Sequence, residues 1–231
     1  NISVESAMSD SQVSQAVDYG RMVGRNLASM TDCLIIGESI PGGTTTALAV
    51  LRGLGFKAKV SSSIPNNPIE LKNQIVNSAL GRLTSDNPYH IIATVGDPMI
   101  AFVAGMLSSA SEITKVMLAG GTQMAAVLAF ASKIGFNEQN TAIGTTSYIS
   151  NDNSANFKSL VSEIADIPAI SVNPGLENSK FSGLKAFSQG FAKEGVGAGG
   201  SIIASMIKTG NDSTHFLTLS EKEYHRLFTS L

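Results

Sequence analysis

The stretch "CLIIGESIPGGTTTALAVLRGLG" runs from Cys33 to Gly55 and joins a strand to a helix through a glycine-rich turn. The apolar, branched run that ends at Gly37 is typical of a buried strand in a parallel sheet. The glycines that follow let backbone N–H groups approach an anion, and a helix that starts at Gly43 or Thr44 would present its positive N-terminal end there. The stretch therefore predicts a strand–turn–helix unit with an anion-binding turn.

The turn resembles a phosphate-binding P-loop but departs from it at one position. Gly37, Gly42 and Thr44 fit the pattern G-x-x-x-x-G-K-[ST], whereas Gly43 replaces the lysine and Glu38 adds a negative charge beside the first glycine. Without that lysine the turn cannot neutralise the β- and γ-phosphates of ATP or GTP, so a monophosphate is the better fit. The alternative is that the glycines only form the turn. The residues expected to contact substrate here are Gly37, Gly42, Gly43, Thr44 and Thr45.

Strand-like apolar runs alternate with helical segments along the whole chain. This alternation, with nearly continuous apolar strands, is typical of a parallel sheet covered on both faces by helices. We therefore predict a single α/β domain over residues 1–231, with a Rossmann-like three-layer α/β/α fold and a mainly parallel sheet. Ligands are expected at the carboxyl edge of that sheet. The expected strands cover residues 32–37, 57–63, 89–96, 115–121, 140–149, 167–173 and 215–220. The expected helices cover residues 10–30, 44–55, 69–83, 97–112, 122–135, 153–166, 180–193, 199–210 and 221–228.

Composition argues against several classes of function. Hydrophobic residues make up 43% of the chain and charged residues 15%, with a net charge of −2. This balance suits a globular protein with a large core and gives no basic footprint for nucleic acid or an anionic membrane. No apolar run reaches the length that spans a bilayer, and with a single cysteine the cytoplasm is the expected compartment. The three histidines stand far apart, so we expect no metal site and no cofactor.

Two further strand-end turns carry candidate substrate-binding residues. Gly120 and Gly121 follow the apolar run "KVMLA", where backbone contact with substrate and simple turn formation are equally good interpretations. The turn "VNPGLE" follows a later strand and contains Asn173 and Gly175, with Asn173 and Glu177 able to form hydrogen bonds. Both turns are expected at the same edge of the sheet as the first one.

The segment "KEGVGAGG" contains a second acidic residue beside a glycine-rich turn. Gly195, Gly197 and Gly200 fit G-x-G-x-x-G, but the segment before them is helical and polar, so a dinucleotide fingerprint is not expected. Glu194 stands where a helix begins, and a surface carboxylate there would be stabilised by the helix end alone. Its functional interpretation rests on Glu38, which occupies the same position at the first turn.

Four motifs in order resemble the nicotinate-nucleotide–dimethylbenzimidazole phosphoribosyltransferase family, in its archaeal and cyanobacterial branch. They are "GESIPGGTTTALA" from Gly37, "LAGGTQMAAVLA" from Leu118, "VNPGLE" from Val172 and "EGVGAGG" from Glu194. Order and approximate spacing agree over about residues 10–210. Members of the family are longer at the N-terminus, so this chain is expected to lack N-terminal family segments.

The resemblance implies a homodimeric enzyme without a cofactor. It implies transfer of phosphoribose from nicotinate mononucleotide to a lower-ligand base, a benzimidazole or a purine, in cobalamin nucleotide-loop assembly, with release of nicotinate and inversion at C1′. It makes Glu194 the general base and places Glu38 at the substrate. Since the ribose becomes cationic as nicotinate departs, a carboxylate beside it is favourable where a lysine would not be. The alternative is a nucleotide- or phosphosugar-binding protein of the same fold without transfer activity.

Overall fold

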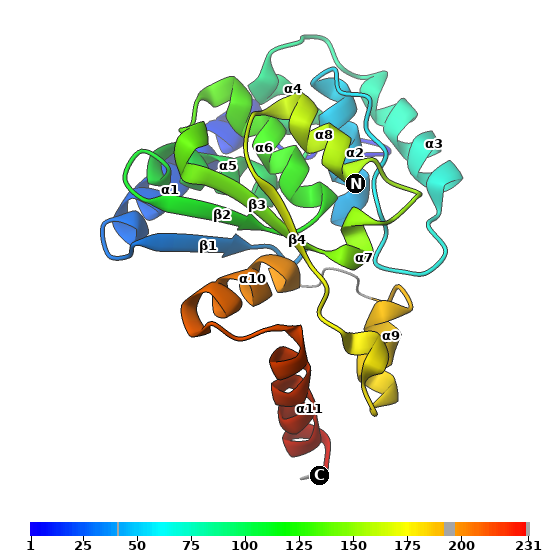
Figure 1. The fold of residues 1–231 in the computed structure, drawn as a ribbon. Helices are drawn as coiled ribbons and strands as arrows, with labels where there is room; N and C mark the ends of the chain where they lie inside the picture. Colours follow the sequence, from blue (N-terminus) through cyan, green and yellow to red (C-terminus); the bar gives the residue numbers. More distant parts are fainter. Residues whose placement is uncertain (41, 192–196, 230–231) are drawn as a thin grey trace.

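The computed structural model describes residues 1–40, 42–191 and 197–229 of the chain (Figure 1). In this part of the chain four parallel strands form one sheet in the order β1-β2-β3-β4. The register aligns Gly37 with Ala119, and Ala119 with Gly144, so neighbouring strands end at a common edge. The strands are β1 (Cys33–Gly37), β2 (Lys115–Ala119), β3 (Thr141–Thr146) and β4 (Ala169–Val172).

The helices cover the two faces of the sheet unequally. Because the strands follow one another in chain order, right-handed crossovers place the connecting helices on one face. Figure 1 shows this thick helical layer on one side, α10 alone on the other, and α11 extending away from the sheet. The helices are α1 (Asp10–Ala28), α2 (Gly43–Gly53), α3 (Ile69–Leu80), α4 (Pro88–Val95), α5 (Pro98–Ala110), α6 (Thr122–Ile134), α7 (Ser147–Ser150), α8 (Phe157–Ile164), α9 (Ser182–Ser188), α10 (Ala198–Thr209) and α11 (Ser213–Thr229), with single 3₁₀ turns at Glu138–Asn140 and Leu176–Asn178.

The main core lies between the sheet and the thick helical layer. Helices α5 and α6 are apolar around most of their circumference, and side chains such as Leu107, Leu128 and Phe130 are fully buried. A smaller cluster that contains Met117 and Ile203 joins the other face of the sheet to α10. The predicted α/β fold with three layers and a parallel sheet is therefore confirmed. None of the described helices combines the length and apolar character needed to cross a bilayer.

The strand predicted over residues 89–96 is wrong, because the segment forms α4. Asn87 caps this helix by accepting a hydrogen bond from the backbone N–H of Tyr89, and Pro88 occupies the first turn. All side chains from Ile91 to Val95 are buried. A short apolar run that is buried on every side has no periodicity to separate strand from helix, so the Asn-Pro start was the more informative signal.

Two other predicted strands do not join the sheet. Residues 57–63 run as an extended segment whose backbone pairs with a side chain: the Asn156 amide accepts from Lys59 N at 2.7 Å and donates to Lys57 O at 2.9 Å. Residues 215–220 lie inside α11, which starts where Asp212 accepts a hydrogen bond from the N–H of His215.

The remaining boundaries differ more modestly from the predictions. The strand predicted over residues 140–149 ends at Thr146 and is followed by the short helix α7. The helix predicted over residues 180–193 is observed as α9 and ends at Ser188 within the described residues. The helix predicted to close with Gly55 has its last helical residue at Gly53, and Gly55 follows with a φ of 95°.

Candidate active site

Glu38 is the first residue after β1, and its side chain is only 9% exposed. One carboxylate oxygen, Oε2, accepts a hydrogen bond of 3.1 Å from the N–H of Ile40, and the other, Oε1, accepts one of 2.9 Å from Nε2 of Gln123. Gln123 lies in the first turn of α6, directly after the strand-end glycines of β2. The carboxylate is therefore fixed at the carboxyl edge of the sheet by N–H donors from two different turns.

The start of α2 packs against the same Gln123 side chain. A Cβ atom added to Gly43 would lie 1.7 Å from Oε1 of Gln123, so a larger residue at position 43 would require the Gln123 side chain to move. Gly42, which precedes the helix, has a φ of 72°, in the left-handed region that favours glycine. The two glycines thus have different roles, since one permits the turn and the other permits contact between α2 and α6.

The second glycine-rich turn meets the first at the sheet edge. Gly197 has a φ of 72° and begins α10, and a Cβ added to it would lie 2.6 Å from the carbonyl oxygen of Ala119 and 3.0 Å from Cα of Gly37. Segments about 160 residues apart in the sequence therefore touch directly beside Glu38. The expectation that these two turns share one edge of the sheet agrees with this contact.

Gly120 and Gly121 complete this edge at the end of β2. A Cβ added to Gly120 would lie 4.0 Å from Cγ of Glu38, and the N–H of Gly120 donates to Gly144 O at 3.0 Å. Gly121 begins α6 and packs against Ile149. Gly120 thus lies beside the carboxylate, whereas Gly121 faces α7.

The threonines of the first turn divide into two groups. Thr44 and Thr45 are half-buried in the first turn of α2, where the N–H of Thr45 donates to Gly42 O at 3.0 Å. The hydroxyl of Thr46 instead donates to Oδ2 of Asp97 at 2.5 Å. Gly42 and Thr45 line a cavity of about 370 Å³ that also reaches Asp97. The hydroxyls of Thr44 and Thr45 are therefore the groups of this turn that could donate to an anion, whereas the hydroxyl of Thr46 serves the α2–α5 contact.

Asn173 and Gly175 lie at the far end of the same edge, beyond β4, and form a separate network. The amide Nδ2 of Asn173 donates to Oε1 of Glu177 at 3.0 Å, and its Oδ1 accepts from the N–H of Gly175 at 3.0 Å. Tyr148 donates to Oε2 of Glu177 at 2.6 Å, which lowers the pKa of the Glu177 carboxyl. Burial, together with the adjacent carboxylate, raises the pKa of the Tyr148 hydroxyl. Three strand spacings of about 4.8 Å separate this network from Glu38.

Glu194 and Gly195 lie outside the described residues. That they lie close to Glu38 therefore stays a prediction. The contact between Gly197 and Gly37 supports it. Among the described residues no group of three or more His, Cys, Asp or Glu side chains is arranged to hold a metal ion.

Two polar residues that organise this edge were not identified from sequence motifs. Gln123 was overlooked because the "GGTQ" turn carries no charge, although a long polar side chain in the first turn of an apolar helix was the available signal. Asp97 caps α5 through the N–H of Ile100 and also accepts from Thr46. Its place directly before a proline is a recognisable start of a helix, but its second partner depends on the tertiary structure.

The fold and its strand-end turns place the chain among α/β proteins whose ligands bind at the carboxyl edge of a parallel sheet. Within that class the chain belongs to a phosphoribosyltransferase family: the family model DBI_PRT, described as phosphoribosyltransferase, matches residues 1–148. The resemblance to the nicotinate-nucleotide–dimethylbenzimidazole phosphoribosyltransferase family is thereby confirmed.

Archaeal relatives match nearly the whole chain. It is 41% identical over 227 residues to an Archaeoglobus fulgidus protein named UPF0284 protein, covering 98% of this chain and 64% of the relative. It is 43% identical over 216 residues to an Aeropyrum pernix protein of the same name, covering 89% of this chain and 59% of the relative. The chain thus spans less than two thirds of the length of either relative.

Two crystal structures from Thermus thermophilus are similar in fold. One is a nicotinate-nucleotide-dimethylbenzimidazole phosphoribosyltransferase, with a TM-score of 0.60 and 22% identity over 75% of this chain and 52% of that chain. The other is CobT, with a TM-score of 0.63 and 21% identity over 75% of this chain and 53% of that chain. At this level of identity the likeness establishes a shared fold.

Proposed function

We propose that this chain transfers phosphoribose from nicotinate mononucleotide to a lower-ligand base, a benzimidazole or a purine, and releases nicotinate. The reaction would belong to assembly of the cobalamin nucleotide loop and would need no cofactor. The family membership supports the transfer of phosphoribose, and the name of the Thermus thermophilus structure supports the choice of donor and acceptor. A homodimer is part of this proposal because the resemblance implies it.

The observation that carries the proposal is the buried Glu38 carboxylate among glycine-rich turns. Its two oxygens accept N–H bonds of 3.1 and 2.9 Å, so the group is held in one orientation before substrate binds. As the bond from C1′ to nicotinate breaks, the ribose gains positive charge while the pyridinium nitrogen becomes neutral. A fixed carboxylate beside that ribose stabilises the transition state more than the ground state.

The second acid in the proposal is Glu194, which acts as general base. The incoming base attacks C1′ through a ring nitrogen and must lose a proton, which a glutamate within hydrogen-bond reach can accept. Gly197, three residues after Glu194 in the sequence, contacts both Gly37 and Ala119. This contact supports a place for Glu194 on the same edge as Glu38.

The substrate phosphate is assigned to the start of α2. The N–H of Gly43 already donates to Ile40 O at 3.3 Å, so the turn contributes the close approach that Gly42 and Gly43 allow and the hydroxyls of Thr44 and Thr45. Helix α2 adds the positive end of its dipole. A 5′-monophosphate can be held there without a cationic side chain, which agrees with the absence of a lysine at position 43. Gly37 and Gly120 flank Glu38 and would approach the ribose.

The test is release of nicotinate. The purified protein is incubated with nicotinate mononucleotide and a panel of benzimidazoles and purines, and free nicotinate is measured by chromatography. We expect turnover with at least one base, and Glu38→Gln and Glu194→Gln should each lower kcat by about 10²–10³-fold. Glu112→Gln, at an exposed glutamate, is the matched control and should leave kcat unchanged.

Two results would contradict the proposal. If nicotinate mononucleotide binds saturably but no base leads to nicotinate release, the chain is a binding protein of the same fold and not a transferase. Turnover that survives both glutamine substitutions would move the chemistry away from these two acids. Circular dichroism and thermal unfolding of each variant distinguish a lost function from a lost fold.

A further inference from the structure

The hydroxyl of Thr46 lies between two acceptors in the first turn of α2. Its oxygen is 3.0 Å from the carbonyl oxygen of Gly43 and 2.5 Å from Oδ2 of Asp97. Both separations are hydrogen-bond distances, but a hydroxyl has a single proton to donate. If both contacts are hydrogen bonds, one of them must therefore take its proton from another group.

The Asp97 carboxyl can supply this proton. When the carboxyl is protonated, it donates to the oxygen of Thr46, and the Thr46 hydroxyl then donates to Gly43 O. When the carboxyl is ionised, Thr46 donates to Oδ2 of Asp97, and the oxygens of Thr46 and Gly43 face each other at 3.0 Å with no proton between them. The protonated form therefore satisfies the start of α2 more completely than the ionised form.

The surroundings of Asp97 favour the protonated form. The residue is 8% exposed, and this burial raises the pKa of its carboxyl. Hydrogen bonds from Thr46 and from the N–H groups of Ile100 and Met99 act in the opposite direction. Since burial is the largest cause of the shift, the exclusion of water is what favours the proton on Asp97.

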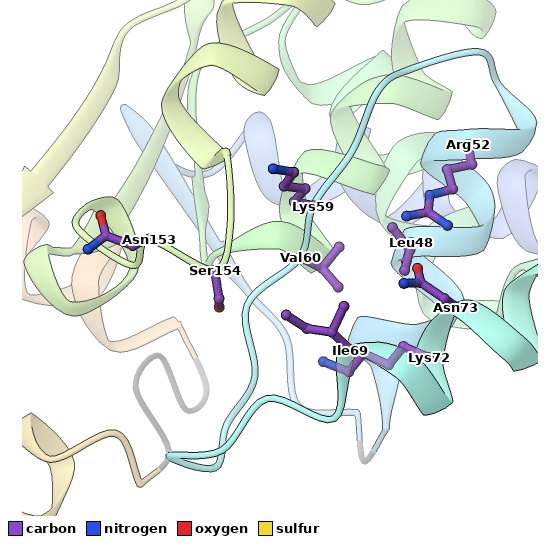
Figure 2. Close-up of a pocket in the computed structure, with 9 residues that line it drawn as sticks. All are labelled: Leu48, Arg52, Lys59, Val60, Ile69, Lys72, Asn73, Asn153 and Ser154. Carbon is purple, nitrogen blue, oxygen red and sulfur yellow. The ribbon is translucent and has the colours of Figure 1, made fainter.

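Charged and titratable groups also occur on the elements that pack around Asp97. Helix α5 has none, and Arg52 and Lys72 line a different cavity, between α2 and α3, which Figure 2 shows. Among the described residues none of these groups forms a hydrogen bond or an ion pair with Asp97. Those on the N-terminal segment, the first turn, α2, α3 and α4 are the amino group of Asn1, Glu5, Glu38, Arg52, Glu70, Lys72, Tyr89 and His90.

We propose that protonated Asp97 holds the start of α2 through Thr46, and that substrate binds at this turn while Asp97 is protonated. Gly43, which Thr46 anchors, packs against Oε1 of Gln123, and Gln123 orients Glu38. Asp97 lines the same cavity as Gly42 and Thr45, so an ionised carboxylate there repels an anion held at this turn. Asp97 is thus a positioning residue, and the part of the proposal that concerns substrate rests on the proposed function.

The first test needs no substrate. NMR follows the carboxyl carbon of Asp97 and the amide of Thr44, which shares its peptide group with the Gly43 carbonyl, from about pH 3 to about pH 8. We expect both signals to change with one midpoint, above 3.8. In Thr46→Val the Asp97 signal should still titrate but the Thr44 signal should no longer follow it, and Thr46→Ser should restore the coupling. Thr218→Val, which removes a hydroxyl that donates to a carbonyl within α11, is the matched control and should leave the coupling unchanged.

The second test compares the Kd for nicotinate mononucleotide of the parent protein with that of Asp97→Asn, whose amide can donate to Thr46 at every pH. As the pH rises through the raised pKa of Asp97, the Kd of the parent should increase about three- to tenfold relative to that of the variant, the effect of one hydrogen bond. The comparison cancels the titration of the substrate phosphate, because both proteins bind the same ligand. Asp212→Asn, at an exposed acid that caps α11 by accepting from the N–H of His215, is the matched control and should behave as the parent does.

Three results would overturn the proposal. The first is a Thr44 signal in the parent protein that does not follow the titration of Asp97, and this result decides even if Thr46→Val does not fold. The second is a Thr44 signal that still follows Asp97 in Thr46→Val. The third is a ratio of the two Kd values that stays constant with pH, which would leave Asp97 as a cap of α5 only. If nicotinate mononucleotide does not bind the parent at all, the proposed function fails, and the NMR titration alone decides whether Asp97 holds α2.

Discussion

The side-chain amide of Gln123 donates a 2.9 Å hydrogen bond to the buried carboxylate of Glu38, across 85 residues of sequence. Its other amide atom, Oε1, is buried and has no hydrogen-bond partner among the described residues. The same oxygen occupies the space that a side chain at Gly43 would need. Gln123 therefore connects the two strand-end turns of β1 and β2 and sets the orientation of the acid.

The first prediction concerns this positioning role. Gln123→Met keeps the length of the side chain but removes the donor to Glu38, so kcat for nicotinate release should fall by about 10- to 100-fold, the equivalent of one charge-assisted hydrogen bond. KM for nicotinate mononucleotide should change little, because Gln123 acts through Glu38. Gln74→Met, at an exposed position of α3, is the matched control. A rise in KM at constant kcat would instead assign Gln123 to substrate binding.

The second prediction concerns Asp97 and pH. Burial raises the pKa of the Asp97 carboxyl above its ordinary value of 3.8, although bonds from Thr46 and Ile100 N–H act against the shift. A carboxyl whose pKa is raised by folding binds its proton more tightly in the folded protein than in the unfolded chain. Its contribution to the free energy of unfolding is therefore complete below pH 3.8 and is lost as the pH rises through the raised pKa.

Asp97→Asn should therefore gain stability relative to the parent protein as pH increases across that window. The asparagine still has an oxygen that can accept from the N–H of Ile100, so the cap of α5 is retained. Urea unfolding at a series of pH values between about 3 and 7 measures the difference, and all other acids cancel because both proteins carry them. A difference that is constant over this range would contradict the raised pKa.

The third prediction concerns Tyr148 and Glu177. The hydrogen bond from Tyr148 lowers the pKa of the Glu177 carboxyl. The pair therefore stabilises the folded protein at pH values above the ordinary glutamate pKa, and this stabilisation is lost as the pH falls through the lowered pKa. Tyr148→Phe should destabilise the protein at pH 7 by at most about 1 kcal/mol, because Glu177 is exposed and solvent screens the pair. The deficit should shrink in acid, and unfolding at pH 7 and pH 3 measures it. Equal deficits at both pH values would exclude the ionised carboxylate as the cause.

Local signals in the sequence predicted part of the fold and of the site, and tertiary contacts decided the rest. The unit from Cys33 to Gly55 was predictable because a branched apolar run, glycines and a helical pattern each encode one local conformation. Residues 89–96 were not, because every side chain from Ile91 to Val95 is buried and this run leaves no polar face to reveal its period. The choice of hydrogen-bond partner was equally hidden, since Asn173 bonds Glu177 and Glu38 bonds a glutamine from another turn.

The last prediction concerns the contact between α10 and the sheet edge. In Gly197→Ala the added Cβ would approach the carbonyl oxygen of Ala119 to 2.6 Å and Cα of Gly37 to 3.0 Å, and both are backbone atoms that cannot rotate away. Gly210 closes the same helix with a φ of 71°, nearly equal to the 72° of Gly197, but has open space around it. Gly210→Ala is therefore a matched control that adds the backbone strain without the clash.

We expect Gly210→Ala to cost about 1–2 kcal/mol for a left-handed alanine, and Gly197→Ala to cost about 1–3 kcal/mol more for the overpacking. Denaturant unfolding of both variants measures the two costs. Gly197→Ala should also lower nicotinate release more than its loss of stability explains, because a displaced start of α10 separates the two glycine-rich turns. Equal destabilisation by the two substitutions would mean that α10 does not press on Gly37 in solution, and the argument that places Glu194 beside Glu38 would lose its support.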